Sequence, residues 1–256
     1  MFCFGLFGEN PSYKKDERMK SHMYGDSIKQ VNIFVGCRYD CVYCEKSFKA
    51  QMKRRKKYCI KCYNYEPHVH LNKLNSRFPK TKGDEFIWLC ASSDITFAKK
   101  EVIEAILERV REMQDRTFLF QSKNPRCFMH YVFPSNVCLD TTIETNKDDL
   151  YTEGYLISKA PLPSQRYKDL LEVVHPRKFV TIEPILEFDM DVMVKWIKDI
   201  RPERVYIGYD SKKCYLPEPE LSKSEELVKQ LSKFTKAKIK KEWRRAWWEE
   251  CNHRKA

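Results

Sequence analysis

Glycine is scarce in this sequence, and long hydrophobic runs are missing. Only 7 of the 256 residues are glycine, whereas 42% are hydrophobic and 13% aromatic, which excludes fibrous and low-complexity classes and predicts a packed globular core. No stretch approaches the roughly 18 uninterrupted apolar residues that a membrane-spanning helix needs. The apolar residues 1–6 have no basic residue ahead of them and are therefore no signal peptide. We expect one cytoplasmic domain over residues 1–256, without membrane contact.

Acidic residues are also few relative to basic ones. The 36 Asp and Glu residues face 48 Lys and Arg residues, which gives a formal charge of +12 and favours a polyanionic partner such as nucleic acid or a phosphorylated substrate. The 11 cysteines are odd in number and cluster at metal-ligand spacings. In a reducing compartment this pattern argues for bound metal and against disulfides.

Short β-branched or aromatic runs alternate with segments of helical periodicity, such as residues 98–114 and 189–199. The predicted strands are residues 30–35, 85–91, 117–121, 137–142, 178–182 and 204–208. The alternation predicts an α/β fold, a partial (βα)6 TIM-like barrel of parallel strands, although a doubly wound sheet would give the same pattern. The barrel core should span about residues 28–240, with peripheral terminal segments and a helical closing segment from Lys236.

Residues 45–84 form an unusually long connection after the first strand, and such insertions are usually functional or disordered. The connection carries a basic run at residues 53–57, followed by Cys59 and Cys62. These two thiols can share a second metal, zinc or iron–sulfur, completed by His68 and His70, by Cys3 or by another chain. Unliganded thiols are the alternative.

Three further cysteines, Cys37, Cys41 and Cys44, follow the first predicted strand after the single residue Gly36. They therefore share one tight loop at the carboxyl end of a strand, which is where the active sites of βα barrels lie. Three thiolates can bind three irons of a cubane cluster and leave the fourth iron open, whereas a purely structural cluster or zinc site uses four protein ligands.

This loop resembles the radical S-adenosylmethionine (SAM) superfamily, whose signature is Cys-x3-Cys-x2-Cys with an aromatic residue, here Tyr43, before the last cysteine. Residues 90–94, 121–123 and 182–184 are similar to elements of a prokaryotic and phage branch whose layout is like that of the spore photoproduct lyases. The resemblance implies a [4Fe–4S] cluster on the three cysteines and SAM at its open iron. It further implies an electron donor such as flavodoxin or ferredoxin, and a 5′-deoxyadenosyl radical that abstracts hydrogen from a substrate.

The resemblance also suggests residues that contact SAM. Ser92, Ser93 and Asp94 occupy the place of a Gly-Gly-Glu segment that usually holds the methionyl amino group, and they depart from it. Lys123, after the third strand, can pair with the SAM carboxylate as a compact cation. The alternative for Lys123 is a solvated loop lysine.

Four other residues at strand ends are candidates. Thr142 and Glu144 can contact the ribose or the methionyl group, or can simply form a turn. Glu183 precedes Pro184 and can bond a ribose hydroxyl or the substrate, or can be a surface residue at a strand end. Cys90 is a candidate hydrogen-atom donor to a substrate radical, or a buried cysteine that packs as a small hydrophobic residue.

A zinc ribbon is the main alternative to the cluster. Cys41 and Cys44 are separated by fourteen residues from the pair Cys59 and Cys62, a spacing close to that of nucleic-acid-binding zinc ribbons. That interpretation leaves Cys37 and the βα pattern unexplained.

A nucleic acid, tRNA or DNA, is one candidate substrate. The basic run at residues 53–57 can follow a phosphate backbone, and Tyr58, Tyr63 and Tyr65 can stack on bases. A solvated basic face is the alternative, and a small metabolite or a peptide is the competing substrate class.

Overall fold

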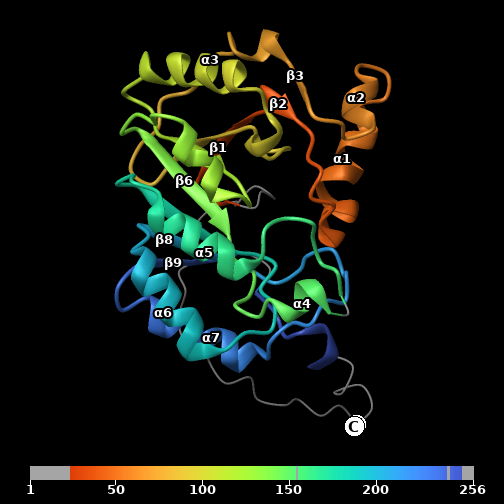
Figure 1. Cartoon of the computed structure of the whole chain (residues 1–256), viewed down its shortest axis with the longest axis vertical. Helices are drawn as coiled ribbons and strands as arrows, with labels where there is room; N and C mark the ends of the chain where they lie inside the picture. The colour runs from red at the N-terminus through yellow and green to blue at the C-terminus, as the bar shows by residue number, and fades with distance from the viewer. Residues whose placement is uncertain (1–23, 154, 241–242, 250–256) are drawn as a thin grey trace, which may run out of the picture.

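A computed structural model describes residues 24–153, 155–240 and 243–249. Its centre is a curled sheet of seven parallel strands in the order β1-β4-β5-β6-β7-β8-β9 (Figure 1). These strands are β1 (Ser27–Val31), β4 (Phe86–Leu89), β5 (Phe118–Gln121), β6 (Val137–Thr142), β7 (Lys178–Ile182), β8 (Arg204–Ile207) and β9 (Lys236–Ile239). Within the described residues β1 and β9 do not pair, so the fold is an open partial barrel. The predicted α/β partial barrel is confirmed.

Two of the predicted elements need correction. The strand predicted at residues 30–35 is divided, because only β1 joins the main sheet, while β2 (Phe34–Val35) pairs antiparallel with β3 (His68–Val69) in a separate sheet. The closing segment from Lys236 begins as a seventh strand, β9, and not as a helix. The β9 lysines Lys236 and Lys238 reach carboxylates at the start of the sheet, and the sequence around them cannot show those distant partners.

Four longer helices lie around the outside of the sheet (Figure 1). They are α3 (Lys100–Arg111), α5 (Pro163–Glu172), α6 (Met190–Ile200) and α7 (Leu221–Leu231), and α4 (Asp149–Thr152) is a single turn. The stripe predicted on α3 is confirmed, since Ile103, Ile106 and Leu107 are buried in the main core. Asp189 caps α6 by accepting a hydrogen bond from the Val192 amide. None of the helices in the described parts of the chain is long and apolar enough to cross a membrane.

The concave side of the sheet is filled by a second, largely aromatic cluster. Its members are Tyr24, Phe86, Trp88, Ala91, Leu119, Cys138, Phe179 and Tyr206. They alternate along the strands with the residues that face the helices, as the pleat requires. Tyr24 meets Trp88 and Tyr206 edge-on at 4.8 Å between ring centroids. The interior is therefore packed with side chains in the manner of a barrel core.

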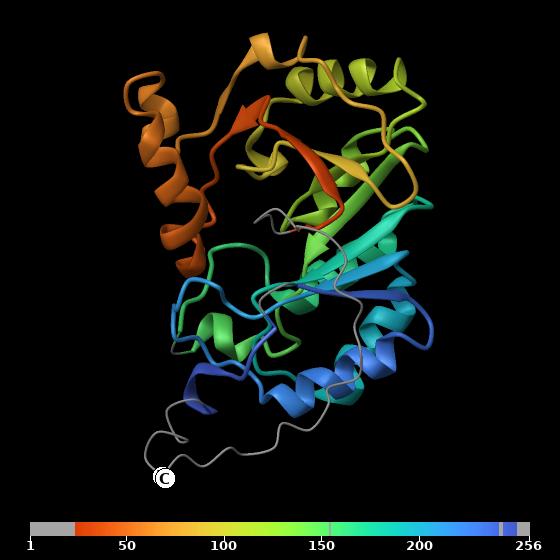
Figure 2. The ribbon, with the colours of Figure 1, turned by 180° about the vertical axis from the view of Figure 1, so that it is seen from behind.

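The long connection after the first cysteines forms a column of short helices. It comprises turns at Glu45–Lys49, Ala50–Met52 (α1), Lys53–Arg55 and Ile60–Tyr63 (α2). Figures 1 and 2 show α1 and α2 along one side of the molecule, away from the helices on the outside of the sheet. Through β3, the connection then returns to β2, just before the cysteine loop.

Candidate cofactor cavity and metal centre

The three cysteines of the loop line one cavity. Cys37, Cys41 and Cys44 face it together with the ring of Tyr43 and side chains at the carboxyl ends of β5, β6 and β7. The further lining residues are Tyr39, Phe48, Tyr65, Ala91, Ser93, Asp94, Gln121, Lys123, Thr142 and Glu183. The cavity thus lies at the edge of the parallel sheet where barrel active sites are found.

Gly36 sets the start of this loop. Its φ is +100°, and its amide donates a hydrogen bond of 3.0 Å to the Ser92 carbonyl oxygen at the end of β4. A Cβ on Gly36 would lie 2.3 Å from the Glu66 carbonyl carbon and oxygen. Glycine is therefore required here both by the backbone conformation and by the close approach of another segment.

The donor set in the cavity fits a [4Fe–4S] cluster with one open iron. The described residues that line the cavity include three cysteines and no histidine. The thiols influence one another, because a hydrogen bond from Cys44 lowers the pKa of Cys41, with Lys123 acting in the same direction. Burial and the nearby carboxylate of Asp94 raise the pKa of Cys37. Three thiols, with neither a fourth cysteine nor a histidine among the described lining residues, match a cluster that keeps one iron open.

Lys123 lies in this cavity but is engaged by an acidic partner. Its ammonium group bonds Glu144, which also accepts a hydrogen bond from the Tyr43 hydroxyl group. On its other oxygen Glu144 accepts a hydrogen bond of 2.6 Å from Arg166 Nη1. Burial acts to raise the pKa of Glu144, but Arg166 and Lys123 outweigh it and hold the pKa at about 2. Glu144 is fully buried and does not line the cavity, and it bonds two residues that do, Lys123 and Tyr43.

Arg166 was not anticipated from the sequence. It lies on the polar-looking helix α5, yet its side chain is fully buried, and it also donates to the Thr142 carbonyl oxygen at 2.9 Å. Its neighbours in sequence give no indication of burial, because the partners that offset its charge lie more than twenty residues away.

The three residues predicted to contact SAM after β4, Ser92, Ser93 and Asp94, differ in placement. Ser93 and Asp94 line the cavity, whereas Ser92 faces Asn32, whose Oδ1 accepts the Ser92 amide at 2.8 Å. Asp94 accepts the backbone amide of Lys123 at 2.7 Å. Asp94 therefore fixes the loop that carries Lys123 and also lines the cysteine cavity.

The remaining candidates differ in placement. Thr142 and Glu183 line the cavity, and Glu183 forms an ion pair with Lys240, a partner that the sequence did not indicate. Cys90 is buried in the main core and outside the cavity lining, and burial raises its pKa to about 12. This placement favours the interpretation of Cys90 as a small core residue.

The structure brings together a second set of ligands in the long connection. Cys59, Cys62, His68 and His70 each offer one atom, and the four atoms all lie within 4.8 Å of one another. Cys41 and Cys44, which a zinc ribbon would join to Cys59 and Cys62, line the other cavity and are not part of this ligand group.

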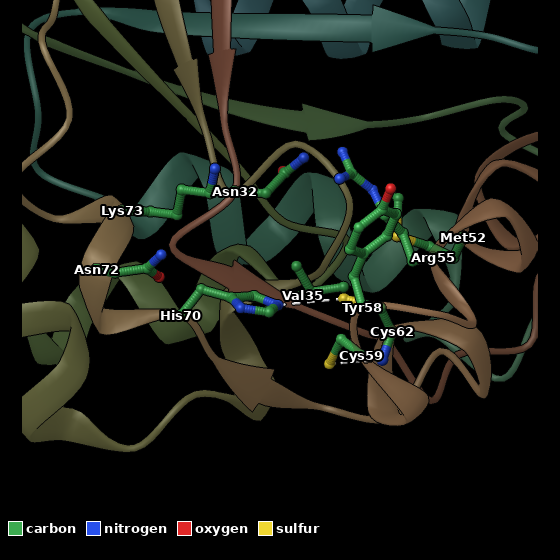
Figure 3. Close-up of a pocket in the computed structure, with 10 residues that line it drawn as sticks. All are labelled: Asn32, Val35, Met52, Arg55, Tyr58, Cys59, Cys62, His70, Asn72 and Lys73. Carbon is green, nitrogen blue, oxygen red and sulfur yellow. Dashed lines mark hydrogen bonds between the residues drawn. The ribbon is translucent and has the colours of Figure 1, made fainter.

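A cavity of about 280 Å³ lies beside the second set (Figure 3). Cys59, Cys62 and His70 contribute to its wall, with Arg55 and Tyr58 beside them. The remaining lining residues are Asn32, Val35, Met52, Asn72 and Lys73. Arg55 of the basic segment and three of the four ligands therefore line the same cavity.

The three tyrosines predicted to stack on bases have different environments. The side chain of Tyr58 is 83% exposed. The Tyr63 ring carries the Lys53 ammonium at 4.5 Å from its centroid. Tyr65 is buried and lines the cysteine cavity, so it is not available to an external base.

Comparisons with known proteins give a structural match only. No protein-family model matches the sequence, and no curated protein sequence is significantly similar to it. A solved structure of a mutant spore photoproduct lyase with bound AdoMet and a dinucleoside spore photoproduct is similar with a TM-score of 0.46 and 10% sequence identity. The match covers 80% of this chain and 61% of that protein, so this chain spans about three fifths of its length.

Proposed function

We propose that the protein is a radical SAM enzyme whose Cys37, Cys41 and Cys44 hold a [4Fe–4S] cluster. The observation that carries the proposal is the convergence of these three thiols on one cavity at the carboxyl end of the parallel sheet. A reduced cluster would supply one electron to bound SAM, whose cleavage would give methionine and a 5′-deoxyadenosyl radical for hydrogen abstraction from the substrate.

The chain's own residues would orient SAM in the cavity. Lys123 is a compact cation next to the cysteines, and it would meet the SAM carboxylate. Ser93 and Asp94 offer oxygen acceptors for the methionyl ammonium group on the adjacent strand end. Phe48 and Tyr65 line the same space and would help to exclude water from the reacting groups.

The proposal includes two external partners. A low-potential donor such as flavodoxin or ferredoxin would deliver the electron. The substrate would be a polyanion, RNA or DNA, because the net charge is +12 and the basic residues 53–57 are all exposed on the column that follows the cysteine loop.

Anoxic reconstitution tests the function directly. Iron and sulfide should be found at four equivalents each per chain, with a cluster EPR signal on reduction and conversion of SAM to 5′-deoxyadenosine. Cys37→Ala, Cys41→Ala and Cys44→Ala should each lose the signal and the cleavage together. Cys214→Ala is the matched control, because Cys214 lies outside this cavity, and it should keep both. Full cleavage by Cys37→Ala would refute the proposal.

A further inference from the structure

We propose that Cys59, Cys62, His68 and His70 bind one zinc ion, and that this ion fixes the start of the cysteine loop. The four residues come from two segments, the turn that contains α2 and the strand β3 with the residue after it, and the fold of the connection brings their ligand atoms together. The zinc site stands independently of the proposed cluster, because it shares no ligand with it.

The distances match a tetrahedral ion. Cys59 Sγ and Cys62 Sγ lie 3.3 Å and 3.4 Å from His68 Nε2, and Cys62 Sγ lies 3.1 Å from His70 Nε2. The two histidine Nε2 atoms are 2.9 Å apart. Bond lengths of about 2.3 Å to sulfur and 2.0–2.1 Å to nitrogen place tetrahedral ligands roughly 3.3–3.8 Å apart. The four distances above lie in that range or no more than about 0.4 Å below it, and all pairs are within 4.8 Å.

The ligand chemistry selects zinc. Two thiolates and two imidazoles in a tetrahedron are the Cys2His2 set of structural zinc sites, whereas calcium and magnesium prefer oxygen ligands. All four positions are filled by the protein, so the ion would have a structural and not a catalytic role.

Neighbouring groups already orient the ligands. The His68 Nδ1 atom lies 2.6 Å from the Glu66 carbonyl oxygen, a contact that makes Nδ1 the donor and leaves Nε2 free to bind metal. The Cys62 amide donates to Cys59 Sγ at 3.4 Å, as expected for a thiolate at the start of a helical turn. The site is thus organised before the ion binds.

The metal ligands are physically joined to the cysteine loop. His68 pairs with Val35 in the β2–β3 ladder, and Val35 lies two residues before Cys37 in the sequence. Gly36 packs directly against the backbone of Glu66 and Pro67, the two residues that precede His68. Loss of zinc would therefore release the segment against which the cysteine loop begins.

Metal binding is tested in the full chain with Cys37, Cys41 and Cys44 all changed to Ala, because those thiols can also capture zinc. This background should bind one equivalent of zinc, and cobalt(II) should give the visible bands of a tetrahedral thiolate complex. Adding Cys62→Ser or His70→Ala should lower zinc affinity at least 100-fold and remove the bands. His130→Ala, an exposed histidine outside the site, should change neither. Absence of bound zinc in the triple variant, or equal binding after Cys62→Ser, would overturn the site.

Hydrogen exchange tests the link to the loop, in cluster-free protein so that the result does not depend on the proposed function. Removal of zinc by a chelator should accelerate amide exchange at least tenfold in peptides covering residues 34–44. Peptides from β6 to β8 should exchange at unchanged rates. Unchanged exchange in residues 34–44 on zinc removal would overturn the link, while the metal measurements would still decide the site.

Discussion

The Arg166 guanidinium group donates a 2.6 Å hydrogen bond to Glu144 Oε2, and neither side chain is exposed to solvent. A buried charge without its partner is strongly unfavourable. Arg166→Met should therefore lower the free energy of unfolding by about 3–5 kcal/mol in denaturant titrations. Lys195→Ala removes an exposed ion pair with Asp199 and should cost less than about 1 kcal/mol. Equal effects of the two substitutions would show that burial of the Arg166 pair is not important for stability.

Lys123→Ala should weaken SAM binding to the cluster-loaded protein. Loss of a charge-assisted hydrogen bond costs about 1.5–3 kcal/mol, a roughly 10- to 150-fold weaker affinity in calorimetry. The loop should keep its position, because Asp94 holds it through the Lys123 backbone amide, and Glu144 keeps Arg166 as partner. As a control, Lys159→Ala removes a lysine that pairs with Asp40 of the cysteine loop and is 73% exposed, and it should leave the affinity unchanged. Unchanged affinity in Lys123→Ala would show that Lys123 pairs with Glu144 and does not contact SAM.

Asp140 gives the fold a pH dependence. It is fully buried, and burial raises its pKa to about 7, although the hydroxyl groups of Tyr24 and Thr181 bond its carboxylate. Between about pH 4 and pH 7 the unfolded chain has lost this proton while the folded chain keeps it, so stability falls as pH rises, by up to about 1.4 kcal/mol per unit. Asp140→Asn should lack this contribution.

The measurement compares the two proteins across that range. The stability of the wild type minus that of Asp140→Asn, from urea unfolding, should decrease steadily from pH 4 to pH 7 and then level off. A constant difference would contradict the raised pKa of Asp140.

Gly36→Ala should disturb both candidate sites together. The added methyl would overlap the Glu66 carbonyl group, and a φ of +100° is unfavourable for alanine. We expect loss of more than half of the bound iron and of the bound zinc. Gly83→Ala is the control, since Gly83 also has a positive φ, +54°, but nothing within 4 Å of a new Cβ. Full metal content in Gly36→Ala would show that neither site depends on the close contact between Gly36 and the Glu66 backbone.

The sequence predicted the sheet well because its strands are covered on both faces. Buried parallel strands form apolar runs with clear limits, and β6 and β7 match their predicted bounds. The edge strand β9 has a lysine at every second position, and none of its four residues is fully buried. Its sequence pattern therefore resembled that of a charged tail.

The candidate site was predictable where its residues are neighbours in sequence. The spacing of Cys37, Cys41 and Cys44 placed them on one loop, and the structure puts them around one cavity. Arg166 and Lys240 were missed, because the acidic groups that hold them are distant in sequence and only the folded chain brings them together.

The column of short helices that follows the cysteine loop carries a run of basic side chains. Residues 53–57 are exposed, and Tyr58 beside them is 83% exposed, whereas Arg55 also borders the metal cavity and should be kept intact. Changing Lys53, Arg54, Lys56 and Lys57 to Gln removes four charges without touching a metal ligand.

If this surface binds a phosphate backbone, the affinity for RNA or DNA should fall with salt at a log–log slope of about −0.7 to −0.9 per contact. The fourfold Gln variant should flatten that slope by up to about three units. It should also lower turnover on the nucleic acid while uncoupled SAM cleavage stays unchanged. A target base would have to be single-stranded or flipped out of a duplex to reach the cavity.

The matched control changes Lys195, Lys198, Lys229 and Lys233 to Gln, which removes the same charge from exposed positions on α6, on α7 and just after α7. An equal loss of slope in both variants would indicate a general effect of net charge and no binding surface on the column. The deciding measurement is 5′-deoxyadenosine formed with and without total tRNA or DNA. No stimulation by either, together with a slope unaffected by the four substitutions on the column, would assign the substrate to small molecules or peptides.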